Sequence, residues 1–113
     1  MKKIECLIQP YNLDTVAEAL AVEGVVGMSV TEIKGFGVQK GFTRGEDVKK
    51  GEFRFHPKMK VEMVVLEKDI ERIVAAIVAS LKSNQIGEGK IFVTPVDDAV
   101  RTRTGARGEA AIQ

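Results

Sequence analysis

The chain has 113 residues, of which 44% are hydrophobic and 29% are charged, values typical of one globular domain. Its 17 basic and 16 acidic residues nearly cancel, which argues against a general nucleic-acid coat, because such proteins need clustered positive charge. One cysteine and one histidine exclude an intrachain disulfide, a metal site of several thiolates and a two-histidine metal site within one protomer. We expect a cytoplasmic protein, because no apolar run could span a bilayer and charges at positions 2, 3 and 5 interrupt any signal peptide.

The first part of the chain has the pattern strand, helix, strand. Residues 2–9 alternate apolar and polar side chains up to Pro10, which predicts a half-buried strand. An amphipathic helix follows, with Asn12 as its N-cap and Gly24 as its stop. Its apolar positions fall at the spacing i, i+3, i+4, i+7: Leu13, Val16, Ala17 and Leu20. Residues 27–34, which are rich in β-branched side chains, predict the second strand.

The second part repeats this order after a long connection. Residues 58–66 alternate as a strand does, and residues 90–96 form another short apolar run that ends near Pro95. Between them, residues 70–81 predict the clearest helix in the chain. Its stripe is Ile70, Ile73, Val74, Ile77, Val78 and Leu81.

This order, βαββαβ, predicts an α+β fold of the ferredoxin-like kind: a four-stranded antiparallel sheet with two helices on one face. The other sheet face then lacks a cover, and it carries Leu7, Val64 and Phe92. Since an uncovered apolar face is a liability in a small monomer, we expect self-association through it. We expect one domain over residues 1–113, with an irregular tail over residues 98–113.

The connection over residues 37–55 is the first candidate functional feature. Hairpin loops usually have two to five residues, so a loop this long in a small domain is either functional or an insertion without consequence. Its glycines, mixed charges and phenylalanines are typical of a segment that a partner orders on binding.

Glycines and cations at the strand ends are the second candidate feature. Gly35 and Gly37 follow the second strand, and Gly87 and Gly89 precede the fourth. Bare main-chain amides can approach a phosphate closely, although each pair alone is better explained as a tight turn. The nearby cations could bind the same anion or be ordinary solvated charges: Lys58, Lys90, Arg101 and Arg103.

Several blocks of the sequence resemble the PII family of nitrogen-regulatory signal-transduction proteins. These are residues 31–37 (TEIKGFG) with 39–41 (QKG), 57–62 (PKMKVE), 86–93 (IGEGKIFV) and 101–105 (RTRTG). The resemblance covers essentially the whole chain. It implies a homotrimer that binds ATP or ADP in clefts between subunits, and 2-oxoglutarate together with Mg-ATP, and that signals through the long loop, the T-loop.

The resemblance also implies site residues. The nucleotide would contact Gly27, Met28, Gly35, Gly37, Val38, Gln39, Glu62, Val64, Gly87, Glu88, Gly89, Lys90, Arg101 and Arg103. The 2-oxoglutarate site would comprise Gln39, Lys40, Gly41, Lys58 and Gly87. Gln39 would also ligate Mg²⁺, and Lys58 would pair with the 2-oxoglutarate carboxylate.

The T-loop departs from the family pattern. Gly51 stands where many members carry the nucleotidylated Tyr, and Lys49 stands where others carry a phosphorylated Ser. Asp47 replaces an Arg that plugs ammonium channels, and Val38 replaces an Arg that touches the γ-phosphate. The resemblance therefore implies an atypical sensor whose target, an enzyme or a membrane transporter that recruits it peripherally, is its own. Loss of 2-oxoglutarate sensing is the alternative.

Two other function classes fit the sequence less well. An enzyme would need a nucleophile and a base, but Cys6 falls in a core strand and no carboxylate near His56 in sequence could orient that side chain. A reader of single-stranded RNA would stack bases on sheet aromatics, and the predicted sheet offers mainly Phe92. We therefore expect a binding sensor without catalytic activity and without a nucleic-acid partner.

Overall fold

The described part of the chain forms a sheet, two long helices and a short terminal helix. The structure is a computed structural model that describes residues 1–36, 54–82 and 89–113. Its strands and helices are β1 (Lys2–Ile8), α1 (Leu13–Val22), β2 (Ser29–Gly35), β3 (His56–Val65), α3 (Ile70–Leu81), β4 (Gly89–Pro95) and α4 (Glu109–Ile112). Short 3-10 turns precede α1 and α3. In this described part, no helix is long and apolar enough to cross a membrane.

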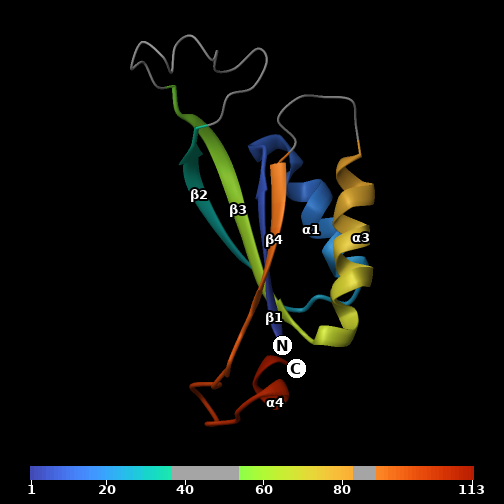
Figure 1. Cartoon of the computed structure of the whole chain (residues 1–113), viewed down its shortest axis with the longest axis vertical. Helices are drawn as coiled ribbons and strands as arrows, with labels where there is room; N and C mark the ends of the chain where they lie inside the picture. Colours follow the sequence, from blue (N-terminus) through green and yellow to red (C-terminus); the bar gives the residue numbers. More distant parts are fainter. Residues whose placement is uncertain (37–53, 83–88) are drawn as a thin grey trace.

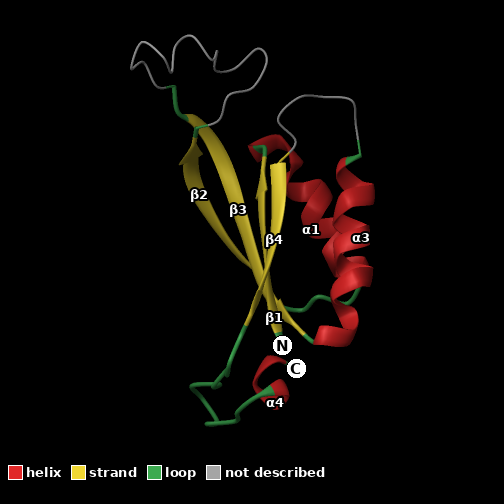
Figure 2. Ribbon diagram, viewed as in Figure 1, coloured by secondary structure: helices red, strands yellow, loops and turns green. Residues whose placement is uncertain are grey.

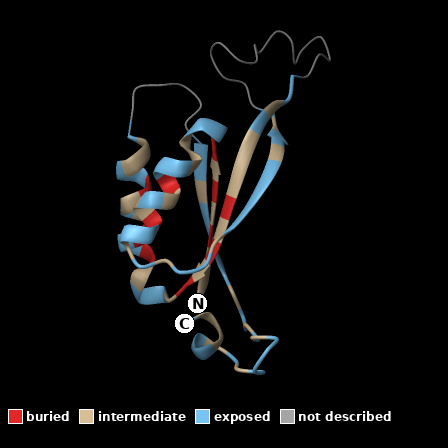
Figure 3. Ribbon diagram, turned by 180° about the vertical axis from the view of Figure 1, so that it is seen from behind, coloured by how far each residue is buried: buried red, intermediate tan, exposed pale blue. Residues whose placement is uncertain are grey.

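The four strands pair antiparallel in the order β2-β3-β1-β4 (Figure 2). β1 lies inside the sheet, where Ile4 stands opposite Met63 of β3 and Val93 of β4. Helices α1 and α3 lie side by side on one face, as views from opposite sides show (Figures 1 and 3). The arrangement confirms the predicted ferredoxin-like α+β fold.

The hydrophobic core lies between the helices and one face of the sheet. Strand alternation turns every second side chain toward the helices. The apolar side chains along one face of each helix pack against these strand side chains. The buried apolar residues are Ile4, Cys6, Ile8, Val16, Leu20, Val61, Met63, Val65, Ile70, Ile73 and Ile77. Burial raises the pKa of the Cys6 thiol to about 11, so Cys6 stays protonated at neutral pH and acts as a core side chain.

The β2–β3 hairpin differs in its bounds from the prediction. We predicted strands at 27–34 and 58–66, whereas the ladder runs from Ser29 opposite Glu62 to Gly35 opposite His56. Leu66 leaves the sheet because it begins the turn that leads into α3. The pairing between β2 and β3 sets where each strand begins and ends. The alternation of side chains within one strand does not reveal this register.

The ends of α1 follow the prediction in part. Gly24 ends the helix as expected, since its φ of 84° suits glycine and its N–H donates to the Ala21 carbonyl at 3.0 Å. Asn12 directly precedes the helix, but no side-chain hydrogen bond from it to the described residues caps α1. Instead, the chain enters α1 through a 3-10 turn, in which the Asn12 N–H donates to the Gln9 carbonyl at 2.9 Å.

The tail is more ordered than the irregular segment we predicted. Val100 forms an isolated antiparallel bridge with Arg107, and Gly105 has a φ of 75°, which lets the chain reverse between them. The short helix α4 follows. The turn at Gly105 and the pairing of Val100 with Arg107 produce this order. The small, polar side chains of the tail gave no indication of it.

Acid is expected to loosen the tail. The Arg107 guanidinium donates a 2.6 Å hydrogen bond to Asp98, and this bond, assisted by the Ala99 N–H, holds the pKa of Asp98 below its ordinary value of 3.8. Such a carboxyl stabilises the fold above that ordinary value and loses its contribution as the pH falls through the lowered pKa. We expect the NMR signals of residues 99–108 to be constant from pH 7 to 5 and to shift below pH 3.8. Asp98→Asn should give the acid pattern at pH 7; an unchanged spectrum would contradict this role.

The sheet face away from the helices carries Leu7, Val64 and Phe92, as predicted, but also a line of charges. Lys60 lies 3.4 Å from Glu62 and 3.7 Å from Glu5, and Lys3 lies 3.9 Å from Glu62. Partly exposed ion pairs add little stability. The face is therefore more polar than the sequence suggested, and self-association through it stays a prediction.

Candidate functional site

Four of the predicted site residues lie at the same end of the sheet. β2 ends at Gly35, β3 begins just before Lys58, and β4 begins at Gly89 and Lys90. The antiparallel register places these strand ends together, with Lys58 opposite Ile33 on one side and Gly89 opposite the last residue of β1 on the other (Figure 1). We call Gly35, Lys58, Gly89 and Lys90 the glycine-lysine group.

Lys58 packs along the main chain of Gly35. A Cβ built on Gly35 would lie 3.1 Å from Lys58 Cγ and 3.7 Å from its Cε. Partial burial lowers the pKa of the Lys58 ammonium, because leaving water disfavours the charged form. A carboxylate or phosphate at this ammonium would offset that cost. The geometry therefore favours an anionic partner for Lys58.

Two aromatic rings lie beside this group. Phe36 follows β2, and Phe55 precedes β3. Their ring centroids are 5.8 Å apart with the ring planes at 49°, a favourable tilted arrangement. The pair joins the two chain segments that lead into and out of residues 37–53, and so fixes the base of the predicted T-loop.

Gly89 brings β4 against the main chain of β1. Its φ is 120°, and a Cβ there would lie 1.8 Å from the Leu7 carbonyl oxygen. Only glycine fits such an approach. Lys90 follows at once and is exposed. An anion site requires main chain without a side chain and a nearby cation, which Gly89 and Lys90 provide. The packing of β4 against β1, however, is by itself enough to require glycine at this position.

A cavity of about 630 Å³ lies at the opposite end of the sheet. Three predicted residues, Gly27, Val64 and Arg101, line it together. Val64 lies six positions after Lys58 on β3, and a strand rises about 3.3 Å per residue, so the glycine-lysine group and the cavity are about 20 Å apart. One chain therefore holds these seven predicted residues in two separate groups.

Met28, Glu62 and Arg103 lie outside the lining of this cavity among the described residues. Met28 packs on the core. The Glu62 carboxylate lies in the charged line of the open sheet face, and Arg103 is exposed. The remaining predicted residues lie outside the part that the structure describes: Gly37, Val38, Gln39, Lys40, Gly41, Gly87 and Glu88.

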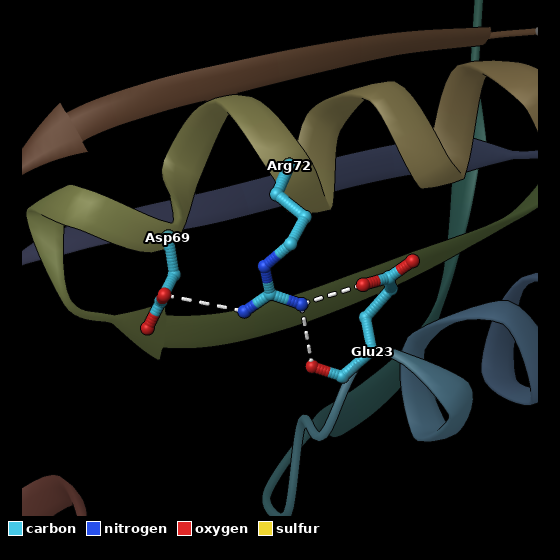
Figure 4. A network of polar contacts seen from close by, with 3 residues as sticks. All are labelled: Glu23, Asp69 and Arg72. Atoms are coloured by element: carbon cyan, nitrogen blue, oxygen red, sulfur yellow. Dashed lines mark hydrogen bonds and ion pairs between the residues drawn. The ribbon is translucent and has the colours of Figure 1, made fainter.

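An arginine that the sequence analysis missed braces one wall of the cavity (Figure 4). Arg72 of α3 donates to the Glu23 carbonyl at 2.8 Å and to the Glu23 carboxylate, and its other nitrogen lies 3.2 Å from the Asp69 carboxylate. Hydrogen bonds to Glu23 and then to Asp69 raise the pKa of Arg72. Glu23 is 49 residues away, so no local pattern could have revealed the contact. Because two carboxylates already engage it, Arg72 joins the end of α1 to α3.

Comparisons with known proteins agree with this fold. Residues 1–106 match the family described as Nitrogen regulatory protein P-II. The chain is 49% identical to the nitrogen regulatory protein P-II of Cereibacter sphaeroides and 48% identical to that of Azospirillum brasilense. Each match covers 99% of this chain and 100% of the relative. A crystal structure of Arabidopsis thaliana PII bound to citrate superposes with a TM-score of 0.79 at 36% identity, over 97% of this chain and 90% of that one.

The fold makes this a ferredoxin-like α+β protein with one sheet face left open by the helices. Within that class, the chain belongs to the nitrogen regulatory P-II family. Proteins of this family are nitrogen-regulatory signal-transduction proteins.

Proposed function

We propose that this protein is a P-II sensor without enzymatic activity that binds ATP or ADP in clefts between the subunits of a homotrimer. Mg-ATP would admit 2-oxoglutarate to the same cleft. The state of the site would pass through residues 37–55 to a partner enzyme or a membrane transporter of nitrogen or related metabolism. The protein would act in the cytoplasm and reach the membrane only through such a transporter.

The separation of the two residue groups is the observation that carries this proposal. The glycine-lysine group and the Gly27–Val64–Arg101 cavity lie at opposite ends of one chain, about 20 Å apart by the strand rise. Each group is half of a nucleotide site: one offers bare main chain and lysines for phosphates, the other an apolar wall and a guanidinium. A second copy joins the two halves if its cavity end meets the glycine-lysine end of the first.

The resemblance supplies the role of each residue in such a cleft. Gly35, Gly89 and Lys90 would cradle phosphates with Gly37 and Gly87, and Glu88 would also contact the nucleotide. Val38 and Gln39 would lie near the phosphates, with Gln39 holding Mg²⁺. Lys58 would bind the 2-oxoglutarate carboxylate beside Gln39, Lys40, Gly41 and Gly87. Gly27, Met28, Glu62 and Val64 would line the base and ribose, and Arg101 and Arg103 would reach the phosphates. Exposed Lys90 directly after Gly89, and Lys58 packed along Gly35 at the same end of the sheet, support the phosphate assignment.

Sequence departures favour one alternative, an adenine-nucleotide sensor that no longer senses 2-oxoglutarate and serves another pathway. Val38 stands where the family has an Arg on the γ-phosphate, which would weaken ATP relative to ADP. Asp47, Lys49 and Gly51 remove the transporter plug and the modification sites. These changes in the predicted T-loop favour a partner from a different pathway.

Calorimetric titration tests the proposal and separates it from the alternative. The intact protein is titrated with ATP, ADP and AMP, each with and without Mg²⁺ and 2-oxoglutarate. We expect ATP and ADP to bind, and saturation at 100 times Kd to stabilise the fold by about 2.7 kcal/mol. Tighter binding of Mg-ATP with 2-oxoglutarate supports the full sensor, and unchanged binding supports the alternative. No heat and no shift in melting temperature at millimolar nucleotide would refute both.

A further inference from the structure

The end of the chain folds back onto the candidate nucleotide cavity. The Gly108 N–H donates to the Ala99 carbonyl at 3.0 Å, and Gly108 has a φ of 67°, so the chain turns there into α4. Ala111, Ile112 and Gln113 then line the same 630 Å³ cavity as Gly27 and Val64. Part of the wall that faces a ligand is therefore the chain's own last segment.

Arg101 holds that segment in place. Its Nη2 donates to the Ala111 carbonyl at 3.3 Å and to the Gln113 main-chain oxygen, and its Nε lies 3.4 Å from the Ala111 oxygen. Nε and Nη2 form the edge with which an arginine binds a phosphate or carboxylate in two-point fashion. The last segment thus occupies the edge of Arg101 that a phosphate would need.

Helix α4 cannot stay in place by itself. It has four residues, all described, and none of them is buried. Helices shorter than about 12 residues are marginal in water without tertiary contacts. The contacts to Arg101 and the cavity therefore decide whether residues 109–113 stay on the wall or leave it.

We propose that residues 109–113 are a displaceable latch: they occupy Arg101 in the empty protein, and a nucleotide polyphosphate releases them by taking over the guanidinium. This inference rests on the proposed nucleotide site. A polyphosphate offers several anionic oxygens, and the planar fork of Arg101 can bind two of them at once, so phosphate competes effectively with the main-chain oxygens of the last segment. Ligand binding is thereby coupled to exposure of the last segment. The latch also lowers apparent affinity by the fraction of time that it is closed.

Deletion of residues 109–113 tests the cost of the latch. The deletion removes no buried residue, so the shortened chain is expected to fold. A latch closed 70–90% of the time predicts that ADP binds about 3- to 10-fold more tightly after its removal. Gln113→Ala is the matched control, because it keeps the main-chain oxygen that Arg101 contacts, and its affinity should equal that of the intact chain. Equal affinities for all three proteins would overturn the latch and leave the nucleotide site intact.

A fluorescent label measures release directly. Cys6 is 0% exposed, so a dye attached to Gln113→Cys reports on the last segment alone. We expect its anisotropy to fall when ADP saturates the protein, and to fall without nucleotide when Arg101→Gln is added. An anisotropy that neither change alters would refute the latch. Failure of the proposed function looks different: no form of the protein binds ADP, while Arg101→Gln still frees the dye.

Discussion

Gly89→Ala is expected to destabilise the folded chain by about 3 kcal/mol or more, because it combines a steric clash with backbone strain. The new Cβ would lie 1.8 Å from the Leu7 carbonyl oxygen and 2.9 Å from its carbon. These are main-chain atoms of β1, which cannot rotate away as a flexible side chain does. The φ of 120° is also one that alanine rarely adopts. Urea denaturation should show a large loss of stability, or the protein should fail to fold.

Two other glycines separate the clash from the strain. Gly24 has a φ of 84°, and among the described residues nothing lies within 4 Å of its Cβ position, so Gly24→Ala should cost about 1–2 kcal/mol from strain alone. Gly27 has neither feature, so Gly27→Ala should stay within about 0.5 kcal/mol of the unchanged protein. If Gly89→Ala were no worse than Gly24→Ala, β4 would not approach β1 as closely as the structure shows.

Gly89 has more than one possible reason to be glycine. The sequence pattern alone favours a tight turn over an anion site. The structure adds a third cause, close passage of β4 past β1, which neither composition nor motif spacing could show. The close approach of β4 to β1 requires glycine at position 89 with or without a ligand. The evidence for a phosphate site is therefore the surroundings of Gly89: Lys90 is next in the chain, and Gly35 and Lys58 lie at the same end of the sheet.

The elements with strong internal periodicity were predictable. The stripe over residues 70–81 gave α3 at its observed bounds, because that pattern lies within one helix. The limits of β2 were wrong by one or two residues, because the register with β3 sets them. Helix α4 was missed altogether, since it depends on a glycine turn and on Arg101, ten residues before Ala111. Sequence patterns thus predicted local order well and long-range order poorly.

For the candidate site, too, the sequence predicted the local features and missed the contacts between distant residues. The residue types were identifiable from the chain, and the antiparallel order of the strands already implied that Gly35 and Lys90 would share one end of the sheet. Their separation from Arg101, however, depends on where the tail folds. The Arg72 brace depends on Glu23 and Asp69 meeting across two helices. Contacts between elements far apart in sequence carry no signal in a single chain.

Lys58→Ala is expected to remove the effect of 2-oxoglutarate on Mg-ATP binding while leaving ADP affinity within about 2-fold. Under the proposed assignment, the ammonium pairs with a ligand carboxylate, and losing such a bond costs about 1.5–3 kcal/mol, or roughly 10- to 100-fold in affinity. Partial burial strengthens the expectation, because the partly desolvated ammonium gains from an anionic partner. ADP would use Lys90 and the arginines and would not use Lys58. Calorimetry with ADP, and with Mg-ATP with and without 2-oxoglutarate, measures both effects.

Lys60→Ala is the matched control, since Lys60 lies two residues further along the same face of β3. Its ammonium already contacts Glu5 and Glu62, so its loss should leave the 2-oxoglutarate effect in place. Gly35→Ala probes the same ammonium without removing it. The added Cβ would lie 3.1 Å from Lys58 Cγ, so the lysine stem must shift by a few tenths of an ångström, and the 2-oxoglutarate effect should weaken partially. Equal losses in Lys58→Ala and Lys60→Ala would mean that general positive charge, and not the position of Lys58 over Gly35, attracts the anion.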